Sequence, residues 1–121
     1  MKLGLVMVLT PDLHEARTFY GDLLELPLKA EGQRELVFDM GGQALHVFRC
    51  EAPAPASARH GATAATVVVF EVASIEDRMR ELRRRGVEFL HETPARNDLG
   101  GFLYAAFRAP GGNVHELIER N

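Results

Sequence analysis

The sequence has a single cysteine, no long apolar run and no excess of basic residues, and each shortage excludes a class of protein. One thiol, Cys50, cannot form an intrachain disulfide, so we expect a reducing compartment and a cytoplasmic protein. The apolar run near the N-terminus stops at Pro11 and is too short to span a membrane. A net charge of −3 without a basic patch argues against nucleic-acid binding.

A strand-to-helix pattern occurs twice in the chain, at positions 62 residues apart. Leu5–Leu9 and Val67–Glu71 are both typical of β-strands. Asp12 in the first copy and Ser74 in the second are each followed three residues later by an acidic residue. This spacing predicts a capped helix N-terminus in each copy, because a short polar side chain there accepts hydrogen bonds from free backbone N–H groups.

Three strand-like segments follow each predicted helix. We expect the first helix to end at Pro27 and the second at Gly86, which suits the left-handed residue after a helix. The segments in the first half are "PLKAEG", "RELVFDMG" and "QALHVFRC", and those in the second are "VEFLHE", "GFLYAAFRAP" and "NVHELIER". Each half is therefore predicted to be a βαβββ module, and the fold class to be α+β.

We expect one domain over residues 1–121, made of two modules. The first module covers 1–50 and the second covers 66–121. The stretch between them, 51–65, is rich in alanine and proline, a composition typical of a linker.

Two motifs carry a resemblance to a known family. "VLTPDLHEARTFYGDLLEL" follows the first strand and helix of the vicinal oxygen chelate superfamily, and "APGGNVHELIE" follows its last hairpin. This superfamily includes glyoxalase I, extradiol dioxygenases, fosfomycin-resistance transferases and bleomycin-resistance proteins. The resemblance implies two βαβββ modules whose curved mixed sheets surround a shared cleft, with the helices outside.

The resemblance also implies four metal-binding positions in that cleft. They fall on Leu5, His46, Val67 and Glu116 of this sequence. Leu5 and Val67 have no lone pair to give to a cation, whereas catalytic zinc and iron sites use three protein ligands. We therefore expect no bound metal. If zinc, nickel, iron or manganese does bind, we expect His46 and Glu116 as ligands, completed by a loop residue or water.

Alternation along the strands extends the predicted site, because every second side chain lies on the same face of a sheet. The predicted ligand-binding residues are Leu5, Met7, His46, Phe48, Val67, Val69, Tyr104 and Glu116. Apolar linings with few polar groups are typical of small-molecule sites. One alternative concerns the alignment: if His46 is matched with His115 instead of Glu116, the one-residue slip moves His46 to the opposite face.

Three functions remain open from the sequence. The first is a protein that binds a small apolar or aromatic molecule without altering it, as bleomycin-resistance proteins do, although the lack of tryptophan weakens that analogy. The second is an enzyme: a metal-dependent lyase, isomerase or dioxygenase, or a cofactor-free one with Glu116 as base and His46 as its partner. The third is a structural dimer with a filled cleft. We expect a small-molecule ligand and a homodimer, with no membrane partner.

Overall fold

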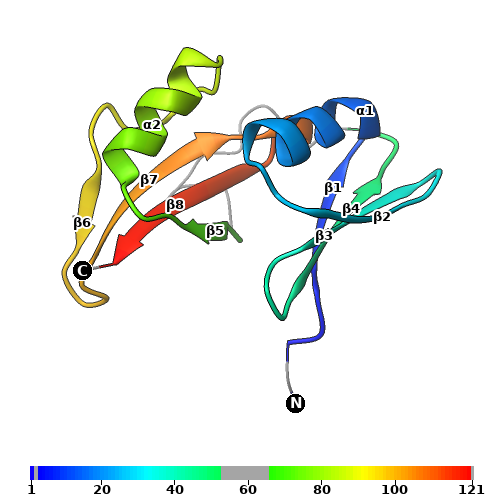
Figure 1. The fold of residues 1–121 in the computed structure, drawn as a ribbon, viewed down its shortest axis with the longest axis horizontal. Coiled ribbons are helices and arrows are strands. Elements are labelled where there is room, and N and C mark those ends of the chain that lie inside the picture. The colour runs from blue at the N-terminus through cyan, green and yellow to red at the C-terminus, as the bar shows by residue number, and fades with distance from the viewer. Residues whose placement is uncertain (2, 53–65, 121) are drawn as a thin grey trace. The chain divides into compact units, whose positions relative to one another are not determined.

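Each half of the chain forms a four-stranded mixed sheet accompanied by one helix (Figure 1). The computed structural model describes residues 1, 3–52 and 66–120. Most of the predicted linker therefore lies outside the described residues.

The chain divides into two compact units. Unit 1 lies within Met1–Pro55 and also takes Pro110–Asn113, and unit 2 lies within Ala56–Ala109 and Val114–Asn121. A short piece of the second half thus belongs to the first unit.

Unit 1 contains four strands and one helical segment. Its elements are β1 (Val6–Thr10), α1 (Leu13–Ala16), η1 (Arg17–Leu23), β2 (Leu28–Glu31), β3 (Glu35–Asp39) and β4 (Ala44–Arg49). The strand order is β1-β4-β3-β2, with β1 parallel to β4 and the other neighbours antiparallel. This is the strand, helix and three strands that the sequence predicts.

The helix of unit 1 begins at its predicted cap but ends earlier than predicted. Asp12 accepts a hydrogen bond of 3.0 Å from the backbone N–H of Glu15. The helix then continues in the wider π-helical form of η1 and ends at Leu23, not at Pro27. Glu25 has a φ of 59°, so the chain leaves the helix through a left-handed residue before the proline is reached.

The helical segment covers one face of the unit 1 sheet and leaves the other uncovered by it. The rings of Tyr20 and Phe38 lie 6.0 Å apart between the two layers. The buried residues of this layer are Val8, Thr10, Leu36, Phe38, Leu45 and Val47 from the strands and Ala16, Phe19, Tyr20 and Leu24 from the helical segment. The side chains that alternate with these strand residues therefore lie on the opposite face.

Unit 2 repeats this plan. Its elements are β5 (Val68–Glu71), α2 (Ile75–Arg84), β6 (Ala95–Asn97), β7 (Phe102–Arg108) and β8 (Val114–Arg120), and the turn η2 (Pro110–Gly112) before β8 belongs to unit 1. The strand order is β5-β8-β7-β6, with β5 parallel to β8. Helix α2 packs on β7 and β8 (Figure 1). The repeated order confirms the predicted α+β class.

One strand of unit 2 lies at a different place from the predicted one. The segment 87–92 forms only an isolated bridge, from Phe89 to Phe107, and the first strand after α2 is β6. The turn before β7 explains this. The side chain of Asn97 accepts from the N–H of Gly100 at 2.7 Å, which folds 95–97 back onto the start of β7.

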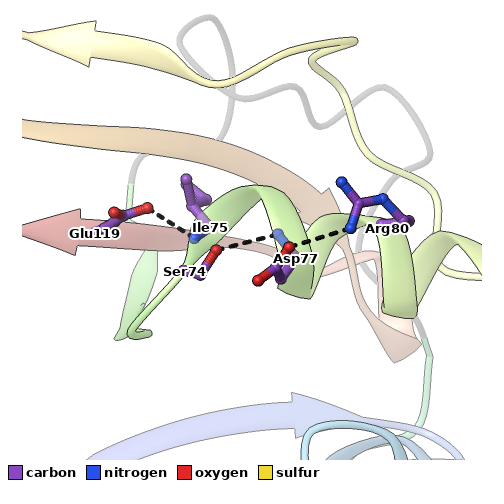
Figure 2. A network of polar contacts seen from close by, with 5 residues as sticks. All are labelled: Ser74, Ile75, Asp77, Arg80 and Glu119. Atoms are coloured by element: carbon purple, nitrogen blue, oxygen red, sulfur yellow. Dashed lines mark hydrogen bonds and ion pairs between the residues drawn. The ribbon is translucent and has the colours of Figure 1, made fainter.

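Two side chains cap the N-terminus of α2, as Figure 2 shows. Ser74, the predicted cap, accepts from the N–H of Asp77 at 3.4 Å. Glu119 on β8 accepts from the N–H of Ile75 at 2.8 Å, and so a carboxylate 44 residues away holds the first turn to the sheet. Asp77 also accepts from the guanidinium of Arg80 at 3.1 Å. At the other end Gly86 has a φ of 95°, as its predicted role requires.

The helix face of unit 2 is apolar apart from one histidine. Its buried residues include Ile75, Met79 and Leu82 of α2 together with Phe70, Ala105, Phe107, His115 and Leu117 of the sheet. No helix among the described residues is long and apolar enough to cross a membrane.

Candidate functional site

Strand β1 and the residue before it present three large apolar side chains to solvent. Leu5, Met7 and Leu9 are 41%, 52% and 49% exposed, while Val8 between them is buried under the helical segment. Because the three alternate along the strand, they lie on one face and form a continuous apolar strip. Such strips are uncommon on protein surfaces and often mark a binding site. Leu5 and Met7 are among the predicted ligand-binding residues.

His46 lies in the middle of this uncovered face. On β4 it stands opposite Met7 of β1 and opposite Val37 of β3, and its side chain is 20% exposed. Phe48 follows on the same face, opposite Leu9. The predicted residues of the first module are thus brought together on one face of one sheet.

A carboxylate that sequence reasoning missed holds the imidazole of His46. Glu35 on β3 places its Oε1 2.8 Å from Nδ1 of His46. Glu35 stands opposite Phe48, which makes it the diagonal neighbour of His46 across the antiparallel pair. The signal was present in the sequence: counting outward from the Gly41-Gly42 turn pairs Val37 with His46 and brings Glu35 within reach.

In unit 2 the predicted residues share the face that α2 does not cover. Val69, 46% exposed, stands opposite Glu116, and Glu116 stands opposite Ala106. Tyr104 pairs with Ile118, two residues along β8 from Glu116, and is half-buried. Val67, half-buried, lies just before β5.

The strand pairing decides between the two alignments of the histidines. Met7 and Val69 occupy the same place in the two repeats, and they stand opposite His46 and Glu116 respectively. Glu116 is therefore the counterpart of His46, and the one-residue slip to His115 is wrong.

His115 points to the other face of its sheet and is 2% exposed. Its ring lies 5.6 Å from the ring of Phe70 and 5.8 Å from that of Phe107, both in edge contact. Burial in these surroundings disfavours the charged imidazolium and lowers the pKa of His115 to about 4, against a smaller opposing effect of a hydrogen bond that the ring donates to the backbone of Val114. This histidine is part of the core.

Comparison with known proteins agrees with this architecture. The family profile of the Glyoxalase/Bleomycin resistance protein/Dioxygenase superfamily matches residues 2–117. The chain belongs to this superfamily. None of the curated proteins compared with the chain matches it.

Solved structures show the same fold. A glyoxalase family protein from Bacillus anthracis superposes with a TM-score of 0.77 at 21% identity, over 100% of this chain and 96% of that one. A lactoylglutathione lyase from Agrobacterium tumefaciens gives 0.75 at 22% identity, over 98% and 92%. The fosfomycin resistance protein FosX from Listeria monocytogenes gives 0.73 at 14% identity, over 100% and 94%. At these identities the likeness extends to the fold alone.

Members of the superfamily often use divalent metals, but the donor set of this chain does not fit a complete metal site. Leu5 and Val67, at two of the four expected positions, carry no donor atom. Among the described residues, no three histidine, cysteine, aspartate or glutamate side chains gather closely enough to hold an ion. A role for His46 and Glu116 as metal ligands stays a prediction.

Of the remaining histidines, one contacts a predicted site residue. His14 is exposed on α1, and His91 is half-buried with its ring 5.5 Å from the ring of Tyr104. His60 lies outside the described residues.

A groove of about 310 Å³ lies elsewhere in unit 2, between α2 and the segment 92–94. Its lining is Glu76, Met79, Arg80, Arg83, Glu92, Thr93 and Pro94. None of the predicted site residues contributes to it.

Proposed function

We propose that the chain is a binding protein of its superfamily, which holds a small apolar or aromatic molecule on the uncovered sheet faces without a complete metal site. The observation that carries the proposal is the exposed apolar strip of Leu5, Met7 and Leu9. Transferring apolar surface from water to a ligand is favourable, by roughly 25 cal/mol for each Å² buried. A ligand that covers these three exposed side chains would therefore gain binding free energy from their burial.

The polar groups beside the strip support a ligand site. A typical small-molecule site combines apolar lining with a few placed polar groups that orient the ligand. In unit 1, His46 lies opposite Met7 on the neighbouring strand and contacts Glu35. In unit 2, Glu116 lies opposite Val69 on the neighbouring strand.

The proposal is tested by a thermal-shift screen with aromatic and drug-like compounds, since a ligand that binds only the folded state raises the melting temperature. A compound that stabilises the wild type should lose its effect in Met7→Glu if it binds unit 1, or in Val69→Glu if it binds unit 2. Leu99→Glu is the control, because Leu99 is fully exposed in the turn between β6 and β7. Equal stabilisation of all four proteins would contradict the proposal.

One observation favours the alternative, a metal-dependent lyase, isomerase or dioxygenase. Histidines that bind metals commonly donate their second ring N–H to a carboxylate, and Glu35 is placed to accept from His46 in that way. The same screen with zinc, nickel, iron and manganese tests this. Stabilisation by one cation that disappears in both His46→Ala and Glu116→Gln would establish the metal binding that the alternative requires.

Two further predictions remain part of the proposal. The first is that the chain forms a homodimer, which light scattering tests by measuring the molecular mass in solution. A cytoplasmic location is tested by fractionating cells that express the chain.

A further inference from the structure

The pairing of Glu35 with His46 fixes which nitrogen of the imidazole carries the proton. A carboxylate is an acceptor only, so the 2.8 Å contact requires that Nδ1 donates. In the neutral ring the second nitrogen, Nε2, is then an acceptor with a free lone pair. The pair is open to solvent, with 20% of the His46 side chain and 33% of the Glu35 side chain exposed.

The residues directly opposite His46 on both neighbouring strands are apolar. The strand neighbours of His46 on the uncovered face are Met7 and Val37, and the next row holds Leu9 and Phe48. Among the described residues, none donates a hydrogen bond to Nε2. The face therefore offers the Nε2 acceptor beside the apolar strip of Leu5, Met7 and Leu9.

We propose that the ligand of unit 1 is an apolar molecule with one neutral hydroxyl group, whose O–H donates to Nε2 of His46. This inference rests on the proposed function and names the ligand class for one of its faces. A neutral donor satisfies the lone pair, while the apolar body covers Met7 and Leu9. An anion is disfavoured, because the ring presents a lone pair and the charge of Glu35 lies directly behind it.

Glu35 acts through His46 and does not touch the ligand, so it is a positioning residue. Its hydrogen bond keeps Nε2 free of hydrogen and holds the ring in place on the sheet. When Nε2 accepts a hydrogen bond, the Nδ1–H becomes a better donor, and the contact with Glu35 strengthens in turn.

The test uses three matched probes: beta-naphthol, its methyl ether and beta-naphthoate. They share one apolar body and differ in whether they carry a neutral donor, no donor or a negative charge. The chain has no tryptophan, so the fluorescence of the naphthalene ring can be read without overlap. We expect beta-naphthol to bind about tenfold more tightly than the ether, as one added hydrogen bond predicts, and naphthoate to bind most weakly.

Variants test whether the preference for naphthol over its ether depends on His46 and Glu35. His46→Phe should bring naphthol and its ether to within about twofold of each other, while the affinity for the ether stays close to that of the wild type. Glu35→Ala should also reduce the preference. In the same variant the nitrogen–proton spectrum of the imidazole should lose the Nδ1–H form that dominates in the wild type. Glu31→Ala is the control, because Glu31 on β2 pairs with Arg17 of the helical segment and should change neither.

The outcomes separate this inference from the proposed function. Equal affinity of the wild type for naphthol and its ether overturns the inference about the hydroxyl group. It does not contradict the proposed function, because both probes would still bind an apolar site. Tightest binding of naphthoate overturns it too, since the ring would then be presenting a positive charge. Failure of all three probes to bind the wild type, with no compound in the wider screen sensitive to Met7→Glu, overturns both for unit 1.

Discussion

His46 and His115 stand in the last strand of their respective modules, yet they lie in opposite environments. His46 is 20% exposed in its side chain and is paired with Glu35, whereas His115 is 2% exposed between two phenylalanine rings. The repeat aligns His46 with Glu116, so the two histidines differ by one position in phase. One position is enough, because successive side chains of a strand point to opposite faces.

The two faces of these sheets therefore give a histidine different properties. The face under the helix excludes water and holds its histidine neutral, which is why the pKa of His115 falls to about 4. The uncovered face leaves its histidine within reach of solvent and of a carboxylate. The same residue type is a packing element in one module and a candidate ligand contact in the other.

The largest effect on stability should come from removing the aromatic ring of Phe107, which packs against His115. Phe107 is fully buried and contacts the rings of Phe70, Phe89 and His115. Phe107→Ala should lower the free energy of unfolding by about 3–5 kcal/mol, as large-to-small changes in cores do. Phe48→Ala, on the uncovered face, should cost clearly less. Urea unfolding measures both, and equal losses would mean that the two faces do not differ in burial as described.

Acid should distinguish the two histidines next. Burial lowers the pKa of His115 from 6.5 to about 4, so the unfolded chain takes up a proton at a higher pH than the folded chain does. The stability is then full above pH 6.5 and falls as the pH drops toward 4, by on the order of 3 kcal/mol. Unfolding at several pH values should show this loss.

The control for the acid experiment is the substitution of each histidine in turn. His115→Leu should remove that part of the pH dependence, and His46→Leu should leave it in place. A wild type and a His115→Leu variant with the same pH profile would contradict the assignment.

The glycine turns of the two modules offer a smaller contrast. Gly41 and Gly111 both have positive φ, 72° and 78°. A Cβ at Gly111 would lie 2.9 Å from Oγ1 of Thr10 and 3.0 Å from the carbonyl oxygen of Leu9, whereas one at Gly41 would meet nothing within 4 Å. Gly41→Ala should cost about 1 kcal/mol through the backbone alone, and Gly111→Ala about 2 kcal/mol or more. Thermal unfolding of the two variants gives the comparison, and equal costs would argue against the close approach.

The last group of expected effects, which includes the smallest, concerns how the two helices begin. Glu119→Ala removes the carboxylate that accepts from Ile75, and it should cost about 1.5 kcal/mol. Ser74→Ala should cost about 0.5 kcal/mol, because its hydrogen bond is long, at 3.4 Å. Asp12→Ala, at the side-chain cap of α1, should cost about 1 kcal/mol. Urea unfolding measures these losses of stability. A larger loss for Ser74→Ala than for Glu119→Ala would contradict the assignment of Glu119 as the stronger cap of α2.

Much of this fold could be predicted because its signals are local. The caps at Asp12 and Ser74, the turns at Gly41-Gly42 and before β8, and the glycine after α2 each depend on a few adjacent residues. The exceptions have local causes that a pattern of apolar residues does not show. The π-helical turn ends the first helix before Pro27, and the Asn97 turn moves a strand from 87–92 to β6.

The candidate site was predicted only in part, since its polar centre depends on pairing across the sheet. The family resemblance placed Leu5 and His46 on the cleft face, and alternation added Met7. Neither could show that Glu35 reaches Nδ1 of His46, because that contact depends on how β3 and β4 align.

By itself the sequence determined the two-module plan, the superfamily and the lack of donor atoms at Leu5 and Val67, because residue type and short-range periodicity are sufficient for these. The tertiary structure decided which histidine is buried, which carboxylate holds the other and which apolar side chains stay in water. These properties arise between residues of different strands and helices. They are set by where a helix docks and how neighbouring strands align, and residue type with short-range periodicity does not give either.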